Sequence, residues 1–74
     1  MFTVEIKNNN GLLVSDLRYD NLAEAVRNAK AGTKNEQGRA IVTDSEDNLV
    51  YDFFFESHGI VRGYDSDGTL VYNT

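Results

Sequence analysis

The stretch Leu49-Val50-Tyr51-Asp52-Phe53-Phe54-Phe55 places the tightest constraint on how this chain can fold. It holds three of the four phenylalanines in the sequence and is bounded by polar residues. Its length and its β-branched and aromatic side chains are typical of a central strand in a sheet and not of a helix. Successive residues of a strand face opposite sides, so Phe53 and Phe54 lie on different faces. We therefore expect a sheet whose two faces both carry large aromatic side chains.

Length and composition limit what can surround such a strand. A chain of 74 residues has room for one domain, spanning residues 1–74, with a single layer of core. It contains no cysteine, so it has no disulfide and no thiolate metal site, as expected in a reducing compartment. Neither a signal peptide nor an apolar run of membrane-spanning length is present, and we expect a cytoplasmic protein with no membrane contact.

The charge balance limits the kind of partner. Twelve acidic residues against seven basic ones give a net charge of −5. Such a chain is repelled by a phosphate backbone, so direct binding to nucleic acid is not expected. A protein partner with a basic surface is compatible with this charge.

The first segment of the chain predicts a hairpin. Phe2, Val4 and Ile6 alternate with polar residues, which is the pattern of a strand with one buried face. Asn10-Gly11 then predicts a two-residue turn, because both residues tolerate positive φ. This register pairs Val4 with Leu17 and Ile6 with Ser15, adds Leu13 and Leu17 to the core face, and sends Leu12 and Val14 to the other face.

One helix follows the hairpin. Asp20 or Asn21 can cap it, and Asn21 has capping-box spacing to Glu24. Gly32 is expected to end it, because glycine accepts the left-handed conformation just past a helix. The polar residues 33–38 then form an exposed loop. The apolar positions recur with helical spacing and form a narrow stripe that suits packing against a sheet: Leu22, Ala25, Val26 and Ala29.

The second half of the chain contains an internal repeat. Residues 44–52 recur as residues 65–73, with five of nine positions identical. Each copy has a polar turn before Leu-Val-Tyr, which predicts two hairpins in succession. A solenoid would need more copies to stack a stable core, so we interpret the repeat as part of a meander.

The two hairpins are joined through Ser57-His58-Gly59. A three-residue loop with Gly59 in the left-handed conformation pairs Phe55 with Val61 and Phe53 with Gly63, whereas a two-residue loop would reverse the faces. The helix-facing side then collects Ala40, Val42, Leu49, Tyr51, Phe53, Phe55, Val61, Leu70 and Tyr72. We predict an α+β fold in which about six antiparallel strands carry one helix on one face, in the order ββαββββ.

No motif for catalysis or for metal binding is present. His58 is the only histidine, and its neighbour Ser57 on a tight turn points away from it, so no hydrolytic pair is expected. Residues 65–69 imitate the start of a calcium loop, but the sequence ends before the glutamate that such a loop requires, which favours a simple Asp-rich turn. We expect a protein that is not an enzyme and has no cofactor.

Two surfaces remain as candidates for function. The first is an acidic end, because alternate turns of a meander emerge at the same end of the sheet; it comprises Asp44, Glu46, Asp47, Asp65 and Asp67. Five carboxylates with no basic residue among them either attract a basic partner or form a solvated tip.

The second candidate is the sheet face that turns away from the helix. Its residues form an apolar surface with one arginine: Leu12, Val14, Ile41, Val50, Phe54, Ile60, Arg62, Tyr64 and Val71. A contiguous patch of this kind on a small protein marks an interface, unless the sheet coils enough to bury part of it or one hairpin register is wrong. Cross-strand pairing places Phe54 near Arg62, whose guanidinium can cover the ring of an otherwise exposed anchor.

The layout of a strand, an Asp/Asn-capped Ala-rich helix and hairpins that end in Leu-Val-Tyr resembles small phage-borne proteins. In size, acidity and layout the chain is similar to some anti-CRISPR proteins that combine a β-sheet with one helix. This resemblance implies an inhibitor in a bacterial or phage-infected cell that blocks a host defence complex by surface docking. The alternative is a self-associating structural protein, in which the uncovered sheet face forms a homodimer interface.

Overall fold

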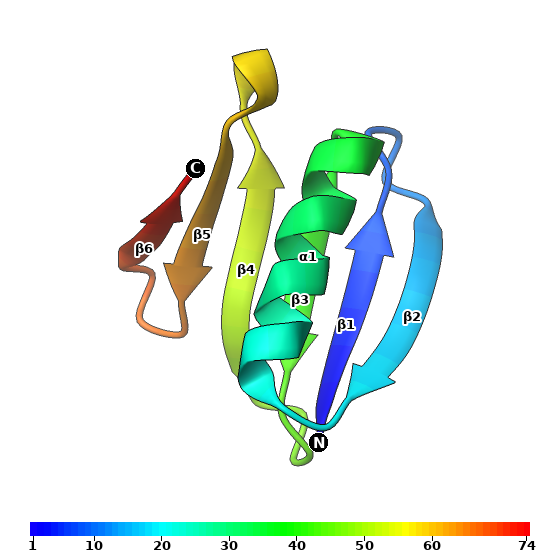
Figure 1. Cartoon of the computed structure of the whole chain (residues 1–74), viewed down its shortest axis with the longest axis vertical. Coiled ribbons are helices and arrows are strands. Elements are labelled where there is room, and N and C mark those ends of the chain that lie inside the picture. Colours follow the sequence, from blue (N-terminus) through cyan, green and yellow to red (C-terminus); the bar gives the residue numbers. More distant parts are fainter.

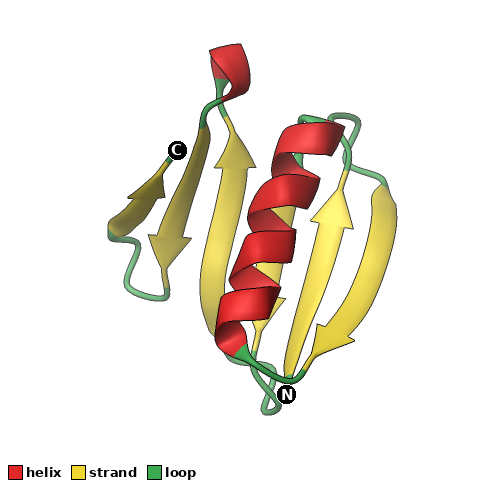
Figure 2. Cartoon of the chain, in the orientation of Figure 1, coloured by secondary structure: helices red, strands yellow, loops and turns green.

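One antiparallel sheet and one helix make up the structure (Figures 1 and 2). The computed structural model describes all residues 1–74. Its elements are β1 (Phe2–Lys7), β2 (Leu13–Tyr19), α1 (Leu22–Glu36), β3 (Arg39–Thr43), β4 (Leu49–Phe55), the short 3-10 turn η1 (Ser57–Gly59), β5 (Val61–Asp65) and β6 (Leu70–Asn73). The six strands follow the order β2-β1-β3-β4-β5-β6. This confirms the predicted α+β fold and its ββαββββ order.

The hydrophobic core lies between α1 and the centre of the sheet. The helix crosses the face formed by β1, β3 and β4 and leaves the outer strands β2 and β6 uncovered (Figure 1). Phe53 is completely buried and is the largest side chain of the core, as its place in the Leu49–Phe55 strand predicted. The buried apolar residues are Val4, Ile6, Ala25, Val26, Ala29, Ala40, Val42, Phe53 and Val61. No helix has the length and apolar character needed to cross a membrane.

The start of α1 agrees with the sequence pattern. Of the two candidate caps, Asn21 is the one used, and its Oδ1 accepts a hydrogen bond of 2.7 Å from the backbone N–H of Glu24. The predicted apolar stripe faces the sheet, with Ala25 and Ala29 completely buried and Val26 nearly so. Small side chains let the helix axis approach the strands closely.

The predicted end of α1 at Gly32 is wrong, as is the exposed loop over residues 33–38. The helix continues to Glu36 because Thr33 extends the buried stripe. Thr33 is completely buried, and its hydroxyl donates to the carbonyl of Ala29 at 2.8 Å, so its polar atom is satisfied. The remaining residues of the last turn are polar because they face solvent and not the sheet.

The two glycines near this end serve close packing instead of termination. A Cβ on Gly32 would collide with the side chain of Ile6, and one on Gly38 would collide with the backbone of Lys7 and Asn8. The left-handed position that ends the helix is occupied by Gln37, with φ 52° and its N–H directed to the carbonyls of Thr33 and Lys34. Gln37 therefore adopts a left-handed conformation that is unfavourable for a residue with a side chain. Both glycines are instead needed where the helix and the chain after it pack closely against β1 and the residue that follows it.

The first hairpin has the predicted pairs but a different turn. Val4 pairs with Leu17 and Ile6 pairs with Ser15, as expected. The loop, however, is closed by Asn8 and Leu12, and the register then shifts by one residue between Ile6 and Lys7. The longer loop and the register shift cancel in their effect on strand pairing. The predicted two-residue turn is therefore wrong, although the predicted strand register is right.

The turns between β1 and β2, between β3 and β4 and between β5 and β6 have the same structure. In each, the first turn residue accepts two backbone N–H groups through its side-chain oxygen, at 2.9 to 3.0 Å, and the fourth residue has positive φ. The first residues are Asn8, Asp44 and Asp65, and the fourth are Gly11, Asp47 and Gly68. The repeat noticed between residues 44–52 and 65–73 is thus a structural one, with a third copy at residues 8–16.

A register shift after each turn changes the face of one leucine. The leucine at the start of each returning strand pairs with a residue of the uncovered face, namely Leu13 with Lys7, Leu49 with Thr43 and Leu70 with Tyr64. These leucines are 53%, 39% and 45% exposed. Their predicted place on the helix-facing side is wrong because the bulge inserts one residue between them and the core positions. Leu17 keeps the predicted face but is 55% exposed, since α1 lies mainly over β1, β3 and β4.

The connection between β4 and β5 agrees with the three-residue loop. Phe55 pairs with Val61 and Phe53 pairs with Gly63, and Gly59 has φ 77°. The adjacent His58 is also left-handed, with φ 65°. Because this register is the predicted one, Phe53 and Phe54 lie on the helix side and the opposite side respectively.

Candidate functional site

The sheet surface opposite α1, called the open face below, has no covering layer. The residues on it alternate with buried core residues along each central strand, so Ile41 and Phe54 face away from the helix. Ile41, Phe54 and Tyr64 are half-buried by their neighbours on the same face. Side chains on the open face therefore contact and partly bury one another, although no helix covers them.

The centre of the open face is a group of contacting polar and aromatic side chains that we call the Phe54 cluster: Arg39, Asp52, Phe54, Arg62 and Tyr64. Phe54 pairs across the sheet with Arg39 on one side and Arg62 on the other. The guanidinium carbon of Arg39 lies 4.8 Å from the centre of the Phe54 ring, within cation–π range. The Phe54 and Tyr64 rings meet edge to face with centroids 6.0 Å apart.

A two-point ion pair fixes the arginine of this cluster. Arg39 donates from Nε to Asp52 Oδ1 at 2.9 Å and from Nη2 to Asp52 Oδ2 at 2.7 Å. The Asp52 side chain is only 15% exposed, against 44% for Arg39. The hydrogen bonds to Asp52 raise the pKa of Arg39 above its already high ordinary value, and partial burial opposes them. The guanidinium is thus held over Phe54 before any partner arrives.

The arginine that covers Phe54 is Arg39, whereas the sequence pointed to Arg62. Arg62 does pair with Phe54, but its guanidinium turns toward Glu56, 3.7 Å away. Arg39 was missed because the buried pattern of its strand begins one residue later, at Ala40. Extending the β3–β4 pairing back to the first residue of β3 would nevertheless have placed Arg39 opposite Phe54.

The other predicted residues of the open face are not one contiguous patch. Ile60 and Val71 are 40% and 46% exposed and lie on the same half of the sheet as the Phe54 cluster. Leu12 directly precedes β2 and Val14 lies within it, 63% and 47% exposed, at the opposite edge of the sheet beyond β1. Val50 was assigned to this face but packs against the core, because the shift in register beside it changes its direction. Val14 and Val71 are the extra, unpaired residues of the equivalent shifts, so their assignment to this face by regular alternation is wrong too.

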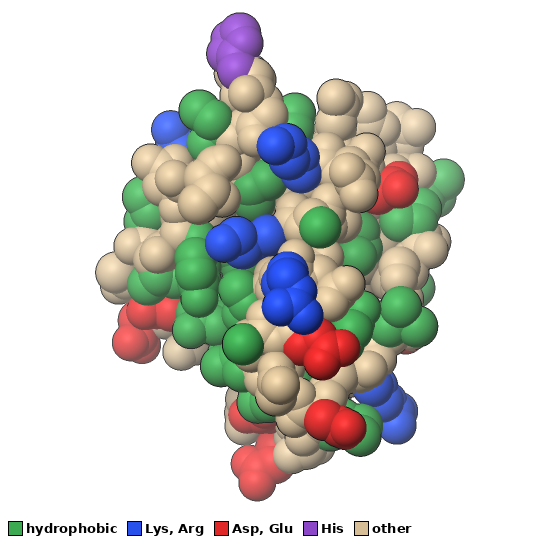
Figure 3. Space-filling model, in the orientation of Figure 1, with side chains coloured by type: hydrophobic (Ala, Val, Ile, Leu, Met, Phe, Trp, Pro, Cys, Tyr) green, Lys and Arg blue, Asp and Glu red, His purple; other side chains and the backbone are tan.

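The two acidic turns emerge at the same end of the sheet, where Figure 3 shows two separate groups of Asp and Glu side chains. The turns lie two strand spacings apart, about 10 Å. That distance is comparable with the screening length in physiological salt, about 8 Å. The five carboxylates thus form two small groups, and no group of three or more is arranged to hold a metal ion.

Two of these carboxylates have a role within their turns. Asp44 accepts the backbone N–H groups of Glu46 and Asn48, and Asp65 accepts the equivalent pair. The pKa of Asp44 is held below its ordinary value chiefly by the hydrogen bond from the backbone of Asn48. A shallow depression of about 200 Å³ also joins Asp44 and Asp47 to Arg18. Arg18 therefore lies near this turn, although it forms no ion pair with either carboxylate.

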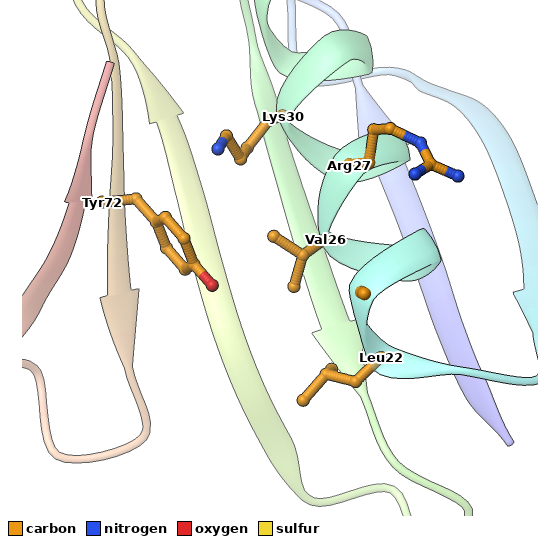
Figure 4. A pocket seen from close by; sticks show the side chains of 6 residues that line it. Leu22, Val26, Arg27, Lys30 and Tyr72 are labelled. Carbon is orange, nitrogen blue, oxygen red and sulfur yellow. The ribbon is translucent and has the colours of Figure 1, made fainter.

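A groove on the helix side was not anticipated from the sequence. It encloses about 450 Å³ and is lined by Leu22, Ala23, Val26, Arg27, Lys30 and Tyr72. Figure 4 shows Tyr72 of β6 opposite Leu22, Val26 and Lys30 of α1, with Arg27 turned away. Lys30 Nζ lies 4.8 Å from the centre of the Tyr72 ring. The groove exists because the sheet is wider than the helix that covers it, so α1 leaves a gap before β6. Local sequence patterns do not predict the width of the sheet.

Burial in this groove affects Tyr72. Its ring contacts Tyr51 and Phe53, with centroids 5.4 and 5.5 Å away. Burial first, and the neighbouring Tyr51 second, raise the pKa of Tyr72 above the ordinary 10.0. The phenol is therefore neutral at physiological pH.

Comparisons with known proteins add no further constraint. No protein-family model, no curated protein and no solved structure matches the chain.

Proposed function

We propose that this chain is a small non-enzymatic protein-binding module that docks a partner protein through the Phe54 cluster of its open face. The observation that carries the proposal is the fixed geometry of that cluster, in which Asp52 holds Arg39 over Phe54. Aromatic residues and arginine are enriched among the residues that contribute most to protein interfaces. A guanidinium that is already oriented loses little side-chain freedom when a partner binds.

The surroundings of the cluster favour a protein surface over a small ligand. The open face is a flat sheet, and neither of the two hollows of the structure is lined by the cluster. Ile60, which is 40% exposed, extends the apolar area beside it. The acidic turns at residues 44–48 and 65–69 lie at one end of the same sheet and favour approach of a basic surface. On this proposal, the partner has an apolar site for Phe54 and basic residues toward the acidic turns.

The resemblance in layout to anti-CRISPR proteins supports one class of partner. A host defence complex in the cytoplasm of a bacterial or phage-infected cell is the first candidate to test. In such a role the chain would act by occupying a surface and would need no reaction of its own. The alternative occupant of the open face is a second copy of this chain, which would make the protein a self-associating structural one.

Affinity capture with matched variants tests the proposal. Phe54→Ser removes the ring from the cluster, while Leu49→Ser removes an apolar side chain that is 39% exposed at the other end of the same strand. We expect wild type and Leu49→Ser to retain the same partner from bacterial lysate and Phe54→Ser to lose it. Equal retention by all three variants would contradict the proposal. If Phe54→Ser instead abolishes self-association of the purified chain, the homodimer alternative is correct.

A further inference from the structure

The edge strand β2 carries an unpaired row of backbone groups. It is the first strand in the sheet order, has seven residues, and lies at one side of the molecule, where α1 does not cover it (Figure 1). Natural proteins usually protect such an edge by making it short, by proline, by charged side chains, by a bulge or by a covering segment, and of these β2 has the charges Asp16 and Arg18 and the bulge near its start. The opposite edge strand β6 has only four residues, whereas β2 contains no proline and has five of its seven residues exposed. An edge of this length is suited to pairing with another strand.

The sequence of β2 is complementary to itself in one register. If two copies pair antiparallel about Leu17, Asp16 of each copy lies directly opposite Arg18 of the other, and the two leucines face each other. Centring the pair on Asp16 or on Arg18 instead would oppose like charges, which is destabilising. Antiparallel pairs with opposite charges directly across are favourable. Among the arrangements centred on residues 16 to 18, the charges of this strand therefore favour the one about Leu17, which is also the one that forms two opposite-charge pairs.

The monomer leaves a charge conflict that this arrangement relieves. On the open face Asp16 is directly opposite Glu5 of β1, and neither carboxylate has an ion-pair partner. Two like charges in that position repel each other. In the symmetric pair, Arg18 of the second copy lies beside Asp16, on the side that faces water in the monomer.

Apolar surface on the helix side adds to the pairing. Leu17 shares the face of its buried partner Val4, yet it is 55% exposed because α1 does not cover β2. In the symmetric pair, the two copies of Leu17 would cover each other between the two helices. We propose that β2 pairs with β2 of a second copy, which joins the two six-stranded sheets into one continuous sheet and leaves both open faces free.

Charge reversal tests this pairing and includes its own control. Asp16→Arg and Arg18→Asp each place like charges opposite each other in the homodimer, so each should raise its dissociation constant by about tenfold or more. An equal mixture of the two variants restores both opposite-charge pairs, so a mixed dimer should form. The double variant D16R/R18D restores them within one chain and should associate like wild type.

Mass in solution is the readout, measured by sedimentation equilibrium over a range of protein concentrations. Wild type should rise from 8.3 kDa toward twice that value. A wild-type mass that stays at 8.3 kDa overturns the proposal. Self-association that survives both single reversals, or a mixture that stays monomeric, also overturns it. Phe54→Ser should leave this dimer intact, so failure of the edge pairing and failure of docking through the Phe54 cluster are distinguished.

Discussion

Replacing Gly63 with alanine should destabilise this protein, although alanine is normally the better residue within a strand. Gly63 is buried opposite Phe53, and a Cβ built there would lie 2.5 Å from Cε1 and 2.8 Å from Cδ1 of the ring. Carbon atoms prefer separations of about 3.5 to 4.0 Å, so the ring would have to move by about 1 Å. It cannot move freely, because Phe53 is completely buried and contacts Tyr51 and Tyr72.

The magnitude follows from two opposing terms. Overpacking a core typically costs about 1 to 3 kcal/mol, while replacing a strand glycine returns about 0.5 to 1 kcal/mol. We expect Gly63→Ala to lower the free energy of unfolding by about 1 to 2 kcal/mol. For a domain of this size that loss lowers the melting temperature by about 4 to 8 °C per kcal/mol.

A double-mutant cycle shows whether the ring is the cause. Phe53→Leu shortens the side chain that faces Gly63, so the added methyl of Gly63→Ala finds room in the double variant. The two changes together should then cost less than the sum of their separate costs, measured by chemical denaturation. Additive costs, or a Gly63→Ala variant more stable than wild type, would refute the close packing of Phe53 on Gly63.

Three further predictions concern the helix and two titrating groups. Gly32→Ala should destabilise by about 1 kcal/mol or more in thermal unfolding despite the helix propensity of alanine, because the new Cβ meets Ile6; a stabilised variant would refute this contact. The raised pKa of Tyr72 stabilises the fold below the ordinary value of 10.0, and this contribution is lost as pH rises through the folded pKa, so wild type should lose stability more steeply at alkaline pH than Tyr72→Phe. The lowered pKa of Asp44 predicts an NMR titration midpoint below 3.8, with its stabilising effect present above that pH and lost as pH falls through the folded pKa; a midpoint at or above 3.8 would contradict its hydrogen bonds to the turn.

The sequence predicted the fold where patterns of side chains repeat along an element. Alternation at Val4 and Ile6 located β1 and its partner residues, and the Leu49–Phe55 run located the central strand with Phe53 inward. Both depend on which face is buried, and burial is the strongest constraint on register. The placement of α1 on one face followed from its narrow apolar stripe. The order of the strands in the sheet was not predicted, because β1 and β3 are neighbours although β2 and α1 lie between them in the sequence.

The errors lie where close backbone packing decides the structure. Gly32 has the local signature of a helix end, but the space above Ile6 determines its role, and that space depends on how α1 lies on β1. The same holds for the leucines Leu13, Leu49 and Leu70, whose face depends on a bulge that no residue type marks. In the candidate site, Phe54 and its orientation followed from the sequence. Arg39 did not, because the choice between two arginines flanking one ring depends on Asp52.

One measurement tests the central claim most directly: the effect of Phe54→Ser on unfolding and on partner affinity, determined with the same purified variant. Loss of the contacts to Arg39 and Tyr64 should lower the free energy of unfolding by only about 1 to 2 kcal/mol, compared with about 3 to 5 kcal/mol for Phe53→Ala. Affinity for the partner retained by wild type should fall by about 2 kcal/mol or more, which is at least about thirtyfold in the dissociation constant. A variant that unfolds as readily as Phe53→Ala, or one that binds as tightly as wild type, would contradict the docking role of the Phe54 cluster.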